Sequence, residues 1–289
     1  MKIKVNGANL YYEEFGKGDR YILSACALFD PERKGWPYDL ADEGFHVFAI
    51  QMRGYGESDH VLENLGDRWY DLWAEDVAAF AGAMGIPRFL YTGASDGGGI
   101  GWHLCLRYPK LLIGFAGIAA GPHSRSVDMS PGRKHTIDAV GSQAAVEQLA
   151  QYNKNTILYF AKKFADNSEL KAEFERKAEW FYHYKRNMSQ EEMRIQPGIP
   201  LPWLKSDEEV REALSSIHFP VLLFIGMKDA MLPLSKAIQP IDAIENAKAV
   251  FYQEANHRLY YGRRDDVRRE ISSFAREAFS ECALYPNMV

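Results

Sequence analysis

One short segment of the chain places a serine where it could act as a nucleophile. Residues 93–97 read Gly-Ala-Ser-Asp-Gly, a G-x-S-x-G pattern with Ser95 at its centre. In this pattern the serine stands on a sharp turn between a strand and a helix, and the small flanking residues let the backbone bend without a clash. The backbone N–H of Asp96 then lies at a helix N-terminus, where it would donate to an oxyanion forming beside Ser95.

A serine nucleophile needs a general base, and the base needs an acid that orients it. Asp229 and His257 follow Ser95 in the order Ser, Asp, His, and each comes just after an apolar run that is typical of a buried strand. Because the carboxyl ends of parallel strands open onto one crevice, we expect the three side chains to converge. His257 would take the Ser95 proton during attack and pass it to the leaving group, while Asp229 would hold the imidazole tautomer. Glu254 is the alternative acid.

Each of these residues also has a simpler interpretation. Glycine-rich turns contain G-x-S-x-G by chance, an Asp after a strand often caps a helix or forms a turn, and a loop His is often a surface residue. Three such residues in one consistent order, each at the end of a predicted strand, favour the catalytic interpretation.

The elements that would position these residues alternate along the chain. The apolar runs predicted as strands are residues 2–5, 10–15, 21–25, 45–50, 89–91, 111–119, 221–226 and 249–253. The segments predicted as helices between them are 36–43, 68–84, 100–108, 234–243 and 265–279. Such alternation predicts an α/β fold with a mostly parallel sheet covered on both faces.

The alternation stops in the middle of the chain. Between about residues 123 and 215 no strand pattern is present, and helices rich in charged and aromatic residues are predicted at 144–152, 156–165, 168–184 and 207–216. We therefore predict that residues 1–122 and 216–289 form the α/β core. Residues 123–215 are predicted to form a helical cap, or lid, over the carboxyl ends of the strands.

At this point the sequence resembles the α/β-hydrolase superfamily over nearly its whole length. The resemblance rests on Trp36, the Arg-Gly-Tyr-Gly-Glu-Ser loop at 53–58, the elbow at Ser95, Tyr108-Pro109, the Gly-Met-Lys-Asp segment at 226–229 and His257. It implies a doubly wound, mostly parallel eight-stranded sheet with a helical cap inserted after the sixth strand. It also implies a serine hydrolase that works without a cofactor.

Two positions depart from the family pattern. Many members carry His-Gly after the third strand, followed by the second oxyanion donor. Here Ala25-Cys26 stands at that position, so the resemblance assigns the donor to the backbone N–H of Ala27. Gln51 stands where an Asp often precedes the Arg-Gly-x-Gly loop. The altered loop leaves open a receptor-like, ligand-binding member with little turnover.

Three further residues are predicted to bind substrate. The segment Ser-Asp-Gly-Gly at 95–98 is similar to valacyclovir hydrolase-like (biphenyl-hydrolase-like) enzymes, in which the Asp contacts the substrate's α-amino group. The resemblance implies that Asp96 favours a substrate with a cationic amine. The alternative is an acid in the first turn favoured by the helix dipole. Trp203 and Met231 are expected near the mouth of the site.

Composition narrows the remaining classes of function. The chain of 289 residues has a net charge of −5 and no long basic run, which argues against nucleic acid or anionic membrane as partners. Its three cysteines are widely spaced, no histidine pair has metal-ligand spacing, and no signal segment is visible. We expect a cytoplasmic enzyme without metal, acting on a small ester or lactone, with a homodimer left open. Hydrolysis of a C–C bond in a β-diketone-like substrate is the enzymatic alternative.

Overall fold

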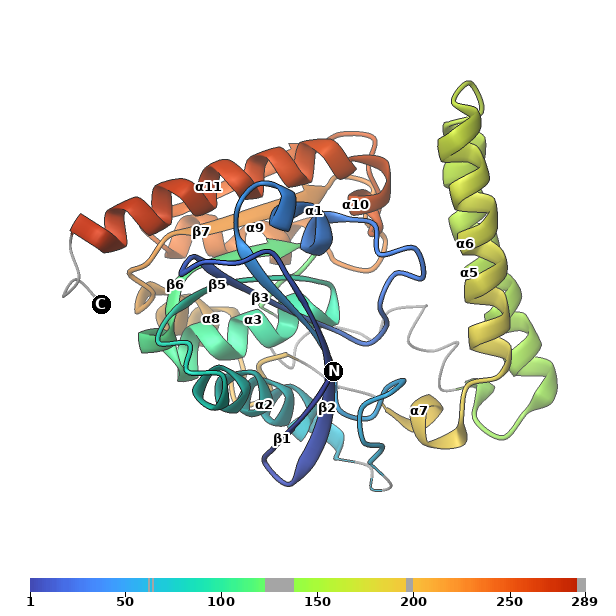
Figure 1. Ribbon diagram of the computed structural model, residues 1–289, viewed down its shortest axis with the longest axis horizontal. Helices are drawn as coiled ribbons and strands as arrows, with labels where there is room; N and C mark the ends of the chain where they lie inside the picture. Colours follow the sequence, from blue (N-terminus) through green and yellow to red (C-terminus); the bar gives the residue numbers. More distant parts are fainter. Residues whose placement is uncertain (62, 64, 123–137, 196–199, 285–289) are drawn as a thin grey trace. The chain divides into compact units, whose positions relative to one another are not determined.

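The computed structural model describes residues 1–61, 63, 65–122, 138–195 and 200–284. Eight strands form one sheet in the order β1-β2-β4-β3-β5-β6-β7-β8 (Figure 1). The pairs from β4 to β8 are parallel, whereas β2 runs antiparallel to both of its neighbours. The strands are β1 (Lys2–Val5), β2 (Ala8–Phe15), β3 (Tyr21–Cys26), β4 (His46–Gln51), β5 (Phe89–Ala94), β6 (Leu112–Ile118), β7 (Val221–Gly226) and β8 (Ala247–Tyr252).

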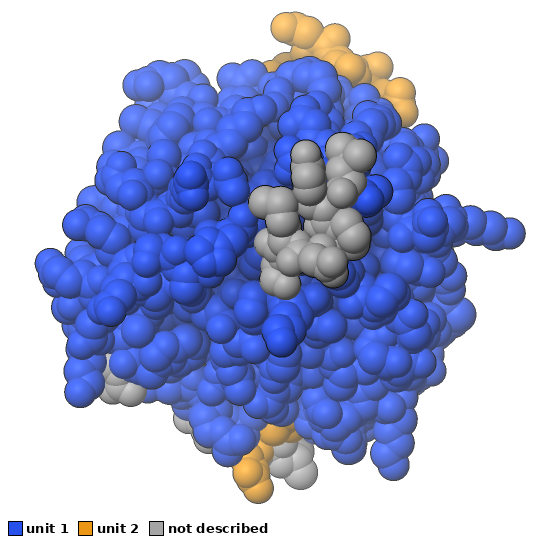
Figure 2. All heavy atoms as spheres, turned by 90° about the vertical axis from the view of Figure 1, so that its left-hand side faces the viewer, with its two compact units in different colours: residues 1–60, 65–128, 197–289 blue, residues 61–64, 129–196 orange. Residues whose placement is uncertain are grey.

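The described residues fall into two compact units, coloured separately in Figure 2. Unit 1 comprises residues 1–60, 65–128 and 197–289, and unit 2 comprises residues 61–64 and 129–196. The helices of unit 1 are α1 (Trp36–Asp42), α2 (Trp69–Ala83), α3 (Asp96–Arg107), α8 (Asp207–Ser215), α9 (Leu234–Ala243), α10 (Leu259–Gly262) and α11 (Arg264–Leu284), with short 3-10 turns at Gly66–Arg68 and Pro109–Leu111. Unit 2 contains α5 (Gln143–Lys163), α6 (Ser168–Arg186) and α7 (Gln190–Arg194).

The core of unit 1 lies between the sheet and the helices on its two faces. One face packs against α1 and α11, whose apolar residues Leu40, Ile271 and Phe274 are buried with Leu90 and Leu222 of the central strands. Helices α2 and α3 cover the opposite face (Figure 1). Burial on both faces explains why the central parallel strands read as continuous apolar runs rather than as alternating patterns.

Unit 2 is a helical hairpin followed by a short helix. Helices α5 and α6 run side by side in opposite directions (Figure 1) and are joined through the turn after Phe164. The rings of Phe164 and Phe174 stack with centroids 5.7 Å apart, and Phe160 packs against Phe174 at 5.5 Å. These aromatic pairs give the hairpin an apolar seam of its own.

Two expectations about helices were wrong in detail. The segments 144–152 and 156–165 form the single helix α5, because Asn153 continues the helix while its side-chain amide donates to the Leu149 carbonyl. Helix α3 begins at Asp96 rather than at Ile100. Unit 2 is also narrower than the predicted insertion, since α8 belongs to unit 1. The lid role of 123–215 remains a prediction, and 123–137 and 196–199 lie outside the described residues.

Within the part of the chain that the structure describes, no helix combines the length and the apolarity needed to cross a bilayer.

Candidate active site

The site lies in unit 1 and is built around a strained serine. Ser95 connects β5 to α3 with φ 52° and ψ −116°, in the left-handed half of the backbone map that L-residues with side chains rarely occupy. Its N–H donates to the Ile118 carbonyl at 3.0 Å, and its own carbonyl accepts the Gly99 N–H at 2.9 Å. Strain of this kind costs about 1–3 kcal/mol and survives only where the surrounding structure holds it.

The two outer glycines of the elbow are required by close packing. A Cβ atom on Gly93 would lie 2.4 Å from the Gly97 carbonyl carbon, and a Cβ on Gly97 would lie 2.5 Å from the Ala25 carbonyl oxygen. Neither distance is tolerated by real side chains, because both contacts are with backbone atoms. The elbow therefore packs directly against the end of β3, the strand that leads to Ala27.

A continuous hydrogen-bonded chain connects Ser95, His257 and Asp229. The His257 Nε2 atom lies 2.9 Å from Ser95 Oγ, and His257 Nδ1 lies 2.8 Å from Asp229 Oδ2. Ser95 follows β5, Asp229 follows β7 and His257 follows β8, so the parallel sheet brings together residues that are 162 positions apart. With the carboxylate accepting from Nδ1–H, Nε2 carries the lone pair and accepts the Ser95 hydroxyl proton.

The carboxylate at the end of this chain is buried and fully oriented. The Asp229 side chain is 3% exposed and that of His257 is 18% exposed. Asp229 Oδ1 accepts the backbone N–H groups of Met231 at 2.8 Å and Leu232 at 3.0 Å, which leaves Oδ2 for the imidazole. These two backbone donors fix the rotamer of the carboxylate.

The alternative acid lies away from this arrangement. Glu254 forms an ion pair with Lys228, and both side chains are more than half exposed. Asp229 is the acid that hydrogen-bonds to the His257 ring.

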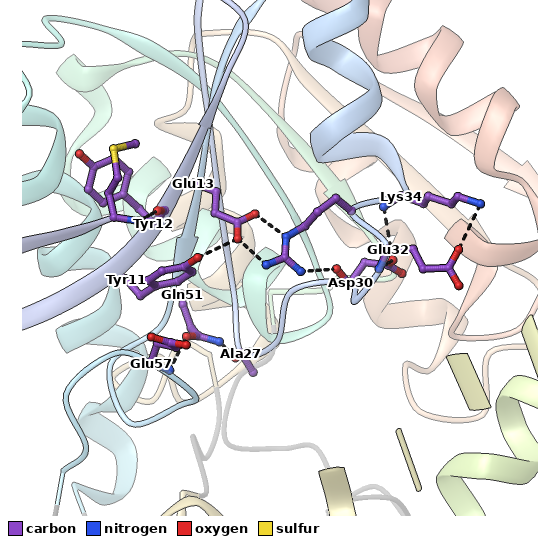
Figure 3. Close-up of polar contacts among 11 residues, drawn as sticks. Tyr11, Tyr12, Glu13, Ala27, Asp30, Glu32, Lys34, Gln51 and Glu57 are labelled. Atoms are coloured by element: carbon purple, nitrogen blue, oxygen red, sulfur yellow. Dashed lines mark hydrogen bonds and ion pairs between the residues drawn. The ribbon is translucent and has the colours of Figure 1, made fainter. Parts of the chain in front are cut away.

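The two backbone N–H groups predicted to form an oxyanion hole belong to residues next to the elbow. Asp96 is the first residue of α3, so its N–H belongs to the helix N-terminus beside Ser95. Ala27 comes directly after β3, which pairs with β5 in parallel, and the end of β3 abuts the elbow at Gly97. The Ala27 carbonyl accepts a hydrogen bond from the Gln51 side chain at 3.2 Å (Figure 3). The oxyanion role of both N–H groups remains a prediction.

The Asp96 side chain has a partner that the sequence did not reveal. The hydroxyl of Tyr70, a buried residue of α2, donates to Asp96 Oδ1 at 2.6 Å. A Cβ on Gly99 would lie 2.3 Å from the Tyr70 ring, so a bare helix backbone is needed for the ring to reach this position. The run of glycines after Ser95 was the signal that a bulky group packs there.

Of the two other predicted substrate residues, Met231 lies beside the site and Trp203 lies away from Ser95. Met231 lies beside the site, since its N–H donates to Asp229. Trp203 packs edge-on against His103 with ring centroids 4.9 Å apart, and it lines a surface cavity of about 400 Å³ together with Arg107. His103 is eight residues beyond Ser95 on α3, about 12 Å along the helix, so this contact does not bring Trp203 to the serine.

The thiol of Cys26, the residue before Ala27, is neutral. Burial raises the pKa of the Cys26 thiol to about 12, so the thiol stays protonated at neutral pH. Among the described residues, no cluster of three His, Cys, Asp or Glu side chains is arranged to hold a metal ion.

Comparison with known proteins places the chain in a family. The profile described as alpha/beta hydrolase fold matches residues 26–263. The AB hydrolase superfamily protein YisY of Bacillus subtilis (strain 168) is 26% identical over 285 residues, covering 92% of this chain and 95% of YisY. The bifunctional esterase/perhydrolase DCH of Acinetobacter calcoaceticus is 22% identical, covering 94% and 97%. The enol-lactonase from Burkholderia xenovorans LB400 superposes with a TM-score of 0.72 at 16% identity, covering 97% and 100%.

Proposed function

The chain belongs to the α/β-hydrolase family, and we propose that it cleaves small carboxylic esters or lactones through an acyl-enzyme on Ser95. The observation that carries the proposal is the hydrogen-bonded chain from Ser95 Oγ through His257 to Asp229, with distances of 2.9 Å and 2.8 Å. These are the distances at which a general base removes a hydroxyl proton. The relatives described as an esterase/perhydrolase and as an enol-lactonase support the same class of bond.

The geometry supports a two-step reaction. Ser95 Oγ attacks the carbonyl carbon while His257 Nε2 takes the hydroxyl proton, and the resulting oxyanion accepts the N–H groups of Asp96 and Ala27. The tetrahedral intermediate collapses, the C–O bond to the leaving alcohol breaks, and His257 donates its proton to that oxygen. Water then attacks the acyl-enzyme with His257 again acting as base, which releases the acid and restores Ser95.

Asp96 is the proposed determinant of selectivity among esters. Its carboxylate follows the nucleophile directly, where a negative charge opposes the developing oxyanion. A cationic amine on the substrate would offset that charge. Kinetics on aminoacyl esters and their desamino analogues test this role: a preference above tenfold that disappears in Asp96→Asn supports it, and equal kcat/KM values refute it.

An active-site labelling and turnover experiment tests the main proposal. We expect p-nitrophenyl acetate to give a burst of p-nitrophenol, and a fluorophosphonate probe to label the Ser95 peptide, with both signals lost in Ser95→Ala. Ser272→Ala is the matched control, because Ser272 is a buried serine of α11 that hydrogen-bonds to Glu43. Absence of labelling in the wild-type protein would refute hydrolysis and favour the receptor-like interpretation. Faster cleavage of a β-diketone than of any ester would favour C–C hydrolysis.

A further inference from the structure

We infer that the side chain of Gln51 positions the oxyanion loop, here defined as residues 26–28, by holding the Ala27 carbonyl. Among the described residues, the Gln51 side chain hydrogen-bonds to the Ala27 carbonyl and the Glu57 N–H rather than to Ser95 or His257, so its role would be positional. The inference rests on the proposed hydrolytic function, in which the Ala27 N–H donates to the oxyanion.

Gln51 is placed beside the loop by the sheet itself. It is the last residue of β4, and its Cα partner in the parallel strand β3 is Cys26. Gln51 is only 5% exposed, and its side-chain Nε2 donates to the Ala27 carbonyl at 3.2 Å (Figure 3). The next backbone group, the Met52 N–H, donates to the Cys26 carbonyl at 2.9 Å.

These two contacts together orient the Ala27 N–H. That N–H belongs to the peptide plane that contains the Cys26 carbonyl, and the two groups point in opposite directions across the plane. The Ala27 carbonyl belongs to the next plane. With both carbonyls anchored on the end of β4, the direction of the Ala27 N–H is set by atoms outside the loop. A loop that lacks a glycine here thus gains a defined donor direction.

The orientation of the Gln51 amide is fixed by its two partners. Its Oε1 accepts the Glu57 N–H at 2.7 Å, so the NH₂ group must face Ala27. The amide lies against the bare Cα of Gly56, where a Cβ atom would come within 2.3 Å of Nε2. Gly56 also has φ +53°, so two independent constraints favour glycine at this position.

A carboxylate cannot replace this amide at neutral pH. Gln51→Glu has the same shape, but an ionised carboxylate has no proton to donate, and two oxygen atoms would then face each other beside Ala27. The neutral acid restores both hydrogen bonds, with its O–H donating to Ala27 and its carbonyl accepting from Glu57. Burial beside a carbonyl oxygen disfavours the charged form, which raises the pKa of the new carboxyl above the usual 4.3 or so.

The titratable groups near Gln51 should not mask the pH dependence of kcat in Gln51→Glu. Burial raises the pKa of Cys26 to about 12, and burial together with Glu13 raises the pKa of Tyr11, so both stay neutral at acidic and neutral pH. Glu13 is held in a bidentate pair with Arg33 at 2.5 and 2.6 Å. Glu57 presents its backbone N–H to the amide and has an exposed side chain.

The expected effect is on kcat rather than on KM. Removing one oxyanion donor costs about 10²–10³-fold in kcat, and displacing it costs less, so we expect Gln51→Glu to lose about 10–100-fold in kcat at pH 7.5. KM should stay within about threefold, because the substrate carbonyl in the ground state accepts a weaker hydrogen bond from the Ala27 N–H than the oxyanion does in the transition state. The affinity for a boronic acid transition-state analogue should fall in parallel with kcat/KM. The ratio of the variant's kcat to that of the wild type should rise as the pH falls toward 5.

Ser58→Ala is the matched control. Ser58 is 2% exposed. Its hydroxyl donates to the Gln51 backbone carbonyl at 2.8 Å and accepts the Tyr11 N–H at 2.9 Å, so its hydrogen bonds are to groups other than Ala27. We expect it to lower stability and to leave kcat within about twofold. Gln51→Met, which buries no charge, provides a second variant that should lose kcat by a similar factor with no recovery at low pH.

The outcomes separate this inference from the proposed function. If the wild type hydrolyses esters through Ser95 while Gln51→Glu and Gln51→Met both keep the kcat of Ser58→Ala, the Gln51 inference is wrong and the proposed function stands. A kcat loss in Gln51→Glu that is equal at every pH would also overturn it. Such a loss would indicate a general structural defect, whereas the loss of a hydrogen-bond donor should be reversed when the new carboxyl is protonated. If Ser95→Ala retains the wild-type turnover, the proposed function fails and the inference fails with it.

Discussion

Replacing Asp229 by Asn should trap His257 in the wrong tautomer. Asp229 Oδ1 accepts two backbone N–H groups, from Met231 and Leu232. An asparagine must keep its single carbonyl oxygen on these donors, so its NH₂ group faces His257 Nδ1. Nδ1 then has to accept, the ring proton moves to Nε2, and Nε2 can no longer take the proton of Ser95.

The structure predicts a large kinetic effect and a small effect on stability. The same substitution in another Ser-His-Asp triad lowers kcat about 10⁴-fold, which corresponds to about 5.4 kcal/mol at 1.36 kcal/mol per factor of ten. The two backbone hydrogen bonds to residue 229 are kept, so the free energy of unfolding should change by no more than about 1.5 kcal/mol. Asp229→Ala should be equally slow but less stable, because it leaves two N–H groups without their acceptor.

Steady-state hydrolysis of p-nitrophenyl acetate between pH 6 and 9 measures the first effect, and urea unfolding measures the second. Glu254→Gln is the control, since Glu254 pairs with Lys228 at the surface. It should keep kcat/KM within about twofold. A folded Asp229→Asn variant with a kcat/KM within tenfold of the wild type would refute the reasoning, because it would show that the carboxylate does not select the tautomer.

Two further predictions concern stability and reactivity. Asp76 is 3% exposed and accepts Arg53 Nε at 2.9 Å and Nη2 at 2.6 Å. Asp76→Asn should therefore lose about 3–5 kcal/mol in the free energy of unfolding, measured in urea, because the Arg53 charge loses its carboxylate and keeps only neutral acceptors such as the Asn6 carbonyl. Burial raises the pKa of Cys26 to about 12, so the folded chain keeps a thiol proton that the unfolded chain releases near pH 8.5. The contribution of this group to the free energy of unfolding is therefore fully present below about pH 8.5 and is lost as the pH rises toward 12. Iodoacetamide at pH 8.5 should therefore label Cys26 at least about 100-fold more slowly in the folded protein than in guanidinium chloride, and equal rates would contradict this.

The sheet could be predicted from the sequence because burial on two faces leaves a strong signal. The central strands β5, β6 and β7 are apolar at nearly every position, and short apolar runs bounded by turn residues are typical of strands buried on both faces. Once the parallel order of the strands was expected, convergence of Ser95, Asp229 and His257 followed from the rule that their carboxyl ends share one edge. The antiparallel hairpin between β1 and β2 could also be predicted, because an Asn-Gly pair favours a tight turn that needs positive φ at both residues. Asn6 and Gly7 both have positive φ in the structure.

Helix propensity does not predict the start of α3 at Asp96, because tertiary packing overrides it there; only the elbow pattern puts a helix N-terminus beside Ser95. Four glycines among residues 97–101 argue against a helix on propensity alone. In the structure a Cβ on Gly99 would lie 2.3 Å from the Tyr70 ring, and one on Gly101 would lie 2.2 Å from the Phe115 ring. The glycines are thus needed for the helix to approach α2 and β6, and this requirement depends on residues that are distant in the sequence.

The oxyanion loop is where local sequence reasoning fails most clearly. Ala25-Cys26 and Gln51 look like two unrelated departures from the family pattern, because they are separated by a helix and a strand. The sheet register makes Cys26 and Gln51 direct neighbours, and the Gln51 amide reaches the carbonyl that follows Cys26. A loop without glycine has fewer accessible backbone conformations, and a buried amide donor selects one of them. We therefore infer that the two departures act together, with the Gln51 amide setting the direction of the Ala27 N–H in a loop that has no glycine.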